Sequence, residues 1–259
     1  MIHYQTEREK ERFWIGENEF LPEYELKTES VLAQCNGYMG VRAAHPFSLI
    51  EEQRGMFLSG AFNKAYEGEV TELVNCPDVT WFGLEIDGEK IYPERSCLKS
   101  FERKLDIFSG ELVIRYVFAL GEKGEVLVEN RRFASMVQSG LFAQTLRVQF
   151  LGDKSGQVKV KTGINGQITN SGVSHFHTST ARVYEKEVME IRSELENGTV
   201  TEATGCKVVR GVQEEKEFNL KRRSVYGTYV IVPEDKEVIF EKVTLADPVS
   251  YTHLTLPTT

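Results

Sequence analysis

The chain has 259 residues, of which 41% are hydrophobic and 27% charged, a composition typical of soluble globular proteins with one large domain or two small ones. Its formal net charge of −8 argues against nucleic acid or an anionic membrane surface as the main partner. No apolar run reaches bilayer length, and residues 1–10 are charged and lack the apolar core of a signal peptide. We therefore expect a cytoplasmic protein.

The cysteines fit that expectation. The chain has four, and none forms a C-x-x-C pair; they are Cys35, Cys76, Cys97 and Cys206. In a reducing compartment such scattered cysteines are expected to be free thiols.

The first elements along the chain are strands and a tight turn. Residues 6–13 carry charge pairs at helical spacing, but the Trp14-Ile15 pair that follows favours the start of a strand. Residues 29–42 indicate a strand, a turn and a second strand. Within them Asn36-Gly37 is typical of a type I′ turn with positive φ at both residues, and Gly40 allows a bulge or a close backbone approach.

The middle and end of the chain predict hairpins. Runs rich in β-branched and aromatic residues alternate with short turns, which pairs 111–118 with 125–133, 143–151 with 157–162, and 225–232 with 237–243. Residues 214–218 fit either a short helix or a solvated loop. The spacing of the turns predicts an all-β fold, a large two-sheet antiparallel sandwich with little helix.

The end of the chain differs from the rest. Residues 249–259 do not continue the strand before them, and we interpret them as a frameshift, an assembly scar or an expression remnant. We therefore expect one β-domain over residues 1–248.

Several segments carry a family resemblance. Residues 29–42, ESVLAQCNGYMGVR, resemble the E-S-x-x-x-x-x-N-G-Y-x-G-x-R signature of glycoside hydrolase family 65, the inverting α-glucoside phosphorylases. Further segments resemble this family in the same order: 54–62, 72–77 (ELVNCP), 82–89, 101–112 and 164–172. The last of these has Asn165 where the family usually has Asp.

The resemblance implies a fold and separate roles for two domains. Members place an N-terminal super-β-sandwich, similar in architecture to galactose mutarotase, before an (α/α)6 barrel. The barrel carries the general acid Glu and binds inorganic phosphate, the co-substrate. The β-domain packs on that barrel, supports a homodimer and sends a loop toward the active-site mouth.

For this chain the resemblance implies a domain without the catalytic barrel. The complete enzyme would act on an α-linked glucose disaccharide such as maltose, kojibiose, nigerose or trehalose. We therefore expect no catalytic residue, cofactor site or metal site in the chain, and an apolar face left uncovered where the barrel would pack.

The histidines offer the one candidate metal pair. His175 and His177 would share a face if they lay on a strand, so both rings could meet one metal ion. A third ligand at suitable spacing is absent, and a polar sheet face or loop explains the pair as well. His3, His45 and His253 stand alone in the sequence.

Adjacent carboxylates have a simple interpretation. Glu23 with Glu25, Glu51 with Glu52, and Glu214 with Glu215 all lie in charged company, which favours a solvated surface. The short Gly37–Gly40 segment is not a phosphate loop, because it is too brief and no Lys follows it.

Aromatic residues could form a sugar-binding platform. The candidates are Trp14, Tyr38, Trp81, Phe82 and Tyr92, although packing in the core explains each of them more simply.

Two other functions remain open on the sequence alone. A standalone carbohydrate-binding sandwich would show a solvent-facing row of Trp or Tyr. A mutarotase-like epimerase would need a His and a carboxylate converging in one cleft, for which His175 and His177 are the candidates.

Overall fold

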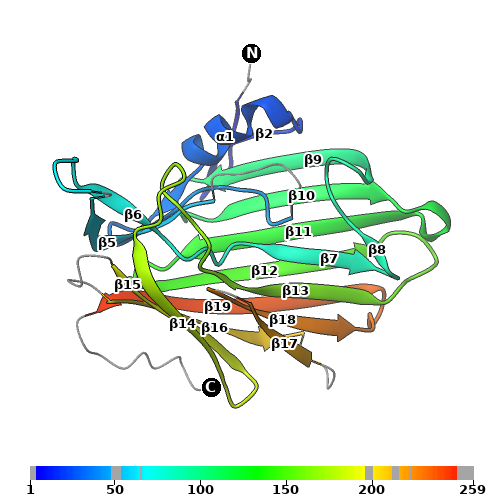
Figure 1. The fold of residues 1–259 in the computed structure, drawn as a ribbon. Coiled ribbons are helices and arrows are strands. Elements are labelled where there is room, and N and C mark those ends of the chain that lie inside the picture. The colour runs from blue at the N-terminus through cyan, green and yellow to red at the C-terminus, as the bar shows by residue number, and fades with distance from the viewer. Residues whose placement is uncertain are drawn as a thin grey trace.

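The computed structural model describes residues 4–47, 54–64, 66–195, 201–211, 216–221 and 223–249. These residues form antiparallel strands in three sheets (Figure 1). Within them the helical elements are α1 (Glu25–Val31) and two 3-10 turns, η1 (Pro22–Tyr24) and η2 (Gly121–Lys123). The expected all-β fold with little helix is confirmed. No helix in these ranges is long and apolar enough for a membrane span.

The largest sheet has ten strands in the order β1-β2-β9-β10-β11-β12-β19-β16-β15-β14. Their bounds are β1 (Gln5–Arg8), β2 (Phe13–Glu17), β9 (Cys97–Asp106), β10 (Leu112–Ala119), β11 (Glu125–Ala134), β12 (Leu141–Phe150), β14 (Phe176–Tyr184), β15 (Val188–Leu195), β16 (Thr201–Arg210) and β19 (Glu237–Val249).

Two smaller sheets cover this sheet. One has five strands in the order β17-β18-β13-β7-β8, and Figure 1 shows it in front of the large sheet. The other has four strands in the order β3-β4-β5-β6. Their bounds are β3 (Gln34–Cys35), β4 (Met39–Val41), β5 (Met56–Asn63), β6 (Glu72–Cys76), β7 (Phe82–Ile86), β8 (Glu89–Lys90), β13 (Val158–Asn165), β17 (Lys216–Lys221) and β18 (Ser224–Ile231).

The core consists of two apolar clusters between these layers. Strand β12 buries alternate residues along its whole length, as expected for a strand with one face on a core. The first cluster joins the ten-stranded and five-stranded sheets and includes Phe118, Val160 and Phe240. The second contains residues of the four-stranded sheet and of the large sheet, among them Leu58 and Ile191.

Two of the three predicted hairpins are wrong in their pairing. Strands β10 and β11 do form the first hairpin. By contrast, β12 pairs with β11 and β19, whereas β13 pairs with β7 and β18 in the other layer. Likewise β18 belongs to the small sheet and β19 to the large one. The turns at 151–157 and 232–236 therefore carry the chain across the core, so that the flanking strands pack face to face.

The N-terminal region differs from its predicted strands at one place. Trp14 and Ile15 lie in β2, so the strand expected there is confirmed, whereas the helical charge spacing of residues 6–13 does not produce a helix, because these residues belong to the β1–β2 hairpin. Residues 29–31, predicted as strand, end helix α1 instead. The helix buries Glu25, Thr28 and Glu29, and their partners on other elements outweigh the local strand preference. Residues 214–215 lie outside the described residues, and strand β17 begins at Lys216.

The β3–β4 hairpin has a tight turn of a different type from the one predicted. Gly37 has φ of +84°, but Asn36 does not have a positive φ. The backbone N–H of Asn36 donates to the Met39 carbonyl, and Asn36 Oδ1 accepts from the Tyr38 and Met39 backbone N–H groups. Gly37 and Tyr38 are therefore the two turn residues, and of these only Gly37 has a positive φ. A Cβ on Gly40 would meet nothing within 4 Å, so no close backbone approach explains that glycine.

Candidate functional site

Four of the family-like segments converge on one cleft, although they are far apart in sequence. The cleft has a volume of about 660 Å³ and lies between the β4–β6 region and the loop that connects β13 with β14. Its walls include Arg42, Arg54, Phe57, Glu72, Asn75, Asn165, Gln167, Ile168, Thr169, Asn170, Ser171 and Gly172. We call it the motif cleft. None of these residues was predicted as part of a site from the sequence. The feature that could have indicated the cleft is that its residues belong to the family-like motif segments.

The asparagines of the motif cleft fasten the β13–β14 loop to β6. The Asn170 side chain accepts a hydrogen bond from the Asn75 backbone N–H at 2.8 Å and donates to the Leu73 carbonyl at 2.9 Å. The Asn75 side chain in turn donates to the Thr169 carbonyl at 3.2 Å. These carboxamides satisfy backbone groups, so they shape the loop.

Asn165, where the family usually has Asp, also holds backbone. Its Oδ1 accepts hydrogen bonds from the Gln167 backbone N–H at 3.0 Å and from Ser224 Oγ at 2.9 Å. Both contacts use a side-chain oxygen as acceptor, which Asn and Asp both possess. The substitution therefore preserves the local structure while removing one negative charge.

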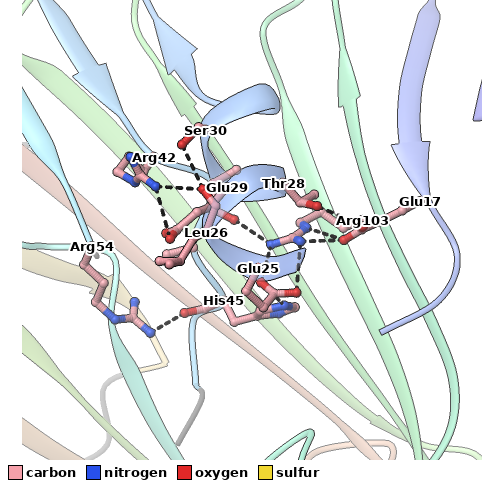
Figure 2. Close-up of polar contacts among 12 residues, drawn as sticks. Glu17, Glu25, Leu26, Thr28, Glu29, Ser30, Arg42, His45, Arg54 and Arg103 are labelled. Carbon is pink, nitrogen blue, oxygen red and sulfur yellow. Dashed lines mark hydrogen bonds and ion pairs between the residues drawn. The ribbon is translucent and has the colours of Figure 1, made fainter. Parts of the chain in front are cut away.

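Two arginines, Arg42 and Arg54, line the motif cleft, and Arg42 also forms an ion pair with the buried Glu29 (Figure 2). Arg42 Nη2 lies 3.2 Å from Glu29 Oε1 and donates to the Leu26 carbonyl at 3.0 Å. The Glu29 side chain is fully buried, and burial raises its pKa in spite of Arg42. Arg54 donates to Thr80 Oγ1 at 3.0 Å and to the His45 carbonyl.

Next to this pair lies a buried cluster centred on Arg103 of β9. Its guanidinium is fully buried and donates to Glu17 Oε1 at 2.9 Å, to Glu25 Oε2 at 3.1 Å and to the Ala43 carbonyl at 3.0 Å. The cluster joins β2, helix α1 and β9, as Figure 2 shows. Burial lowers the pKa of Arg103, but the two carboxylates outweigh it and the net shift is upward.

The two carboxylates of this cluster are shifted in opposite directions. Burial raises the pKa of Glu17, with Arg103 offsetting part of the effect. Burial acts in the same direction on Glu25, but His45 and Arg103 together lower its pKa below the usual value. Glu25 therefore remains the anion that balances Arg103.

His45 is not isolated, contrary to the sequence interpretation. Its Nε2 lies 2.8 Å from Glu25 Oε2, and its Nδ1 forms a hydrogen bond with the Tyr116 hydroxyl. Burial, followed by the charge of Arg103, lowers the pKa of His45 to about 4. The imidazole is thus neutral near pH 7. The arrangement fits a proton on Nε2, facing the carboxylate, with Nδ1 accepting from the tyrosine.

The predicted solvated carboxylates divide into two cases. Glu23 is exposed as expected, but Glu25 is 2% exposed, so the surface interpretation is wrong for Glu25. Its partner Arg103 is 78 positions away in sequence and could not be recognised locally. Glu51, Glu52, Glu214 and Glu215 lie outside the described residues.

The histidine pair does not form a common site. His175 is buried, with its Nε2 2.7 Å from Glu72 Oε1, whereas His177 is exposed and lies at the register shift between Phe176 and Thr178 of β14. Among the residues that the structure describes, no group of three or more His, Cys, Asp or Glu side chains could hold a metal ion. His3 and His253 lie outside those residues.

The His175–Glu72 pair gives the epimerase alternative little support. Glu72 lines the motif cleft, but His175 is 1% exposed and lies behind it. Acid–base chemistry on a sugar ring needs two groups that each reach the substrate. Here the carboxylate contacts the imidazole itself, so the pair fastens the start of β14 to β6.

The candidate platform aromatics are divided between the core and its margins. Trp14 and Phe82 are buried in the core, and Trp81 packs edge-on against Tyr226 with ring centroids 5.6 Å apart. The Tyr38 hydroxyl donates to Asp247. Tyr92 is half-buried. These residues do not form the solvent-facing row that a standalone carbohydrate-binding sandwich would show.

Comparisons with known proteins agree with the motif pattern. The sequence profile of glycosyl hydrolase family 65, N-terminal domain, matches residues 15–246. The kojibiose phosphorylase of Escherichia coli strain K12 is 34% identical over 190 residues, which cover 73% of this chain and 25% of that protein. The kojibiose phosphorylase of Halothermothrix orenii is 33% identical over 207 residues, 79% of this chain and 26% of that protein.

Two proteins with lower sequence identity to this chain are also named as disaccharide phosphorylases. The maltose phosphorylase of Bacillus subtilis is 26% identical over 140 residues, which cover 50% of this chain and 18% of that protein. A solved structure of a provisionally named kojibiose phosphorylase from the human microbiome has a TM-score of 0.81 at 16% identity, over 95% of this chain and 33% of that one. That likeness supports the fold.

The three-sheet β-fold and the cleft built from motif residues define an N-terminal β-domain of the kind that accompanies sugar phosphorylases. The chain belongs to glycosyl hydrolase family 65, of which it contains the N-terminal domain. It spans about a quarter of the length of the kojibiose phosphorylases it matches.

Proposed function

We propose that this chain is the N-terminal domain of a disaccharide phosphorylase that acts on an α-linked glucose disaccharide, with kojibiose as the first substrate to test. The observation that carries the proposal is the similarity over most of the chain to kojibiose phosphorylases, at 34% and 33% identity. The complete protein would use inorganic phosphate to release glucose 1-phosphate and free glucose. Maltose is the next substrate to test, because the more distant relative is a maltose phosphorylase.

The domain itself would have a supporting role. Its buried carboxylates Glu17, Glu25 and Glu29 each have an arginine partner, and the motif asparagines hold backbone groups. Phosphorolysis with inversion needs a carboxylic acid that reaches the glycosidic oxygen while phosphate attacks from the opposite face. We place that acid and the phosphate site in the part of the protein beyond residues 1–248. The predicted boundary at residue 249 is one residue early, because Val249 ends β19 and pairs with Thr201. Residues 250–259 would not belong to the native domain, and the whole protein would be a cytoplasmic homodimer.

The test compares this chain with the longer protein in which the native reading frame continues past residue 248. Both are incubated with phosphate and, separately, kojibiose, maltose, nigerose and trehalose, and glucose 1-phosphate is measured against a heat-killed control. We expect release by the longer protein, fastest from kojibiose, and none by the chain alone. A longer protein inactive on every disaccharide would refute the proposed activity. Release by the chain alone would refute the supporting role.

A further inference from the structure

The motif cleft has the size and the mixture of groups expected of a small-molecule site. Its volume of about 660 Å³ lies within the range of about 300–1,000 Å³ that is typical of such sites. Its lining combines the cations Arg42 and Arg54 with one carboxylate, Glu72, the Phe57 ring, and amide and hydroxyl side chains. Glu72 is already engaged by His175 at 2.7 Å. Positive charge therefore predominates among the described charged side chains that line the cleft.

The two arginines of the cleft are fixed in place by the protein. Arg42 and Arg54 each donate hydrogen bonds to protein oxygens, as described above. A Cβ on Gly55 would meet both Arg42 Cδ and Phe57 Cε2 at 2.8 Å, so the glycine lets that arginine and the aromatic ring pack together against the backbone. Groups that are already held lose little conformational entropy when a ligand binds.

Two further cations lie in the interior behind this wall. Arg132 of β11 and Lys242 of β19 are both 1% exposed. Each is in register with Gln144 of β12, so they form one polar row on the inner face of the ten-stranded sheet. Arg132 Nη2 donates to the Arg42 carbonyl at 3.3 Å, which places it directly behind the cleft wall. Burial, followed by the charge of Arg54, lowers the pKa of Arg132 to about 10.

Arg132 has no fixed counter-charge. Its Nε and Nη1 atoms are buried without a hydrogen-bond partner, and none of the carboxylates that the structure describes forms an ion pair with it. The carboxylate of Asp78 offsets part of its pKa shift, but Asp78 Oδ1 accepts hydrogen bonds from Thr80 and not from Arg132. A buried charge without a partner costs free energy, which an anion at the cleft wall would partly recover.

The β13–β14 loop supplies groups that suit the hydroxyls of a sugar. Gln167, Thr169 and Ser171 are exposed and line the cleft, and their amide and hydroxyl groups both donate and accept hydrogen bonds. The loop is closed by a two-residue turn, in which the backbone N–H groups of Asn170 and Val173 each donate to the other's carbonyl at 2.8 Å. The aromatic ring that lines the cleft offers an apolar surface beside these polar groups, a combination typical of small-molecule sites.

We propose that the motif cleft binds a phosphorylated sugar, with the phosphate group against Arg42 and Arg54 and the sugar hydroxyls against the β13–β14 loop. Guanidinium groups match phosphate oxygens in both charge and geometry. The choice of a sugar as the body of the ligand rests on the proposed function, in which the complete protein releases glucose 1-phosphate. The β-domain would then bind a ligand of its own as well as support the rest of the protein.

Isothermal titration calorimetry tests the affinity of the 259-residue chain for glucose 1-phosphate, glucose 6-phosphate, inorganic phosphate and glucose. Using this chain excludes the phosphate site that we place beyond residue 248. We expect one of the sugar phosphates to bind at least about tenfold more tightly than inorganic phosphate, and glucose to show no measurable binding. Added NaCl should weaken the binding of both anions, because salt screens charge attraction.

Hydrogen–deuterium exchange locates the bound ligand. Residues 164–172 should exchange more slowly when the tighter sugar phosphate is present, both in this chain and in the longer protein. The 232–236 turn serves as the internal reference and should exchange at the same rate with and without the ligand. Slower exchange at the reference turn alone would place the ligand elsewhere and overturn the proposal.

Two variants separate the phosphate contact from the sugar contact. Asn165 lines the cleft, and its Oδ1 accepts two hydrogen bonds that a carboxylate oxygen also accepts. Asn165→Asp should therefore keep the fold and weaken the binding of inorganic phosphate and of the sugar phosphate alike, by about fivefold, through charge repulsion. Gln167→Leu should weaken the binding of the sugar phosphate alone. Asn18→Asp is the matched control, because Asn18 is exposed and does not line the cleft. Circular dichroism checks that each variant keeps its fold.

The outcomes distinguish the hypotheses. Absence of sugar-phosphate binding, or equal effects of Asn165→Asp and Asn18→Asp, would overturn the proposal. Equal affinity for inorganic phosphate and the sugar phosphates would reject the sugar contacts, and tight binding of glucose would reject an anionic ligand. Sugar-phosphate binding by the chain, together with a longer protein inactive in phosphorolysis, would refute the proposed function but not this site. Phosphorolysis by the longer protein without binding to the cleft would do the reverse.

Discussion

Glu29 and Arg42, the first and last residues of the family-like signature, form a buried ion pair of 3.2 Å. Glu29 is a buried residue in the last turn of helix α1. Arg42 directly follows β4 and lines the motif cleft. The signature therefore folds back on itself. Its conspicuous residues join a helix, a hairpin and the wall of a cleft, which explains their pattern without a catalytic role.

Removing one partner of this pair should cost more than removing both. Arg42→Met leaves the Glu29 carboxyl buried without a counter-charge, and breaking a buried pair typically costs about 3–5 kcal/mol. The double variant Glu29→Gln/Arg42→Met removes the stranded charge and should recover at least about 1 kcal/mol of that loss. Urea unfolding of the wild type, both single variants and the double variant measures the coupling. Additive losses would contradict the assigned pair.

Arg103 should be far more sensitive to substitution than an arginine on the outer face of the same sheet. Arg103→Leu strands Glu17 and Glu25 in the interior, so we expect a loss of about 3–5 kcal/mol and detachment of α1. Arg115→Leu is the control. Arg115 is 38% exposed and contacts the half-exposed Glu102 and the buried Glu129. Its loss would leave Glu129 paired with Arg131 at 2.7 Å, so no buried charge is left without a partner and we expect a cost of about 1 kcal/mol or less. Thermal unfolding followed by circular dichroism compares the two; equal losses would rule out the buried cluster as the stronger anchor.

The strands were largely predictable from sequence, but their partners were not. Alternating β-branched residues and short turns identify β12, β13, β18 and β19. The same turn chemistry serves a hairpin and a crossing between layers, however. Whether a turn closes a hairpin or connects two sheets depends on how the flanking strands pack in the core. That packing involves residues that are distant in sequence.

The candidate site was predictable in part. The motif segments were recognised, and their polar residues form the cleft. The buried state of Glu25 and His45 was missed, because charged and aromatic partners from β9 and β10 create their environment. A carboxylate in charged local sequence is usually solvated, so composition favoured the surface interpretation.

His45 should make the protein sensitive to mild acid. In the unfolded chain the ring takes up a proton as pH falls below about 6.5, whereas the buried ring stays neutral down to about pH 4. Because its folded-state pKa is depressed, its contribution to stability is complete above pH 6.5 and is lost between pH 6.5 and pH 4. The free energy of unfolding of wild type minus that of His45→Gln should fall by roughly 3 kcal/mol across this window.

Denaturant unfolding at several pH values checks that difference. The difference cancels the carboxylates that do not contact His45; Glu25, whose pKa His45 helps to lower in spite of burial, contributes to the same difference. His177→Gln supplies the control, because His177 is exposed and the substitution should leave the curve parallel to that of the wild type. A His45→Gln curve that runs parallel to the wild type would show that the buried neutral ring does not control acid stability.

Gly37 and Gly40 lie in the same hairpin but should respond differently to substitution. Gly37 has φ of +84°, a conformation that a β-branched residue adopts only with strain of about 1–3 kcal/mol. Gly40 lies in β4 without a positive φ, and an added Cβ there meets nothing within 4 Å. Gly37→Val should therefore lower the melting temperature clearly, whereas Gly40→Val should change it little, since valine suits a strand. If the two variants melt at the same temperature, the left-handed backbone at Gly37 is not what the hairpin requires.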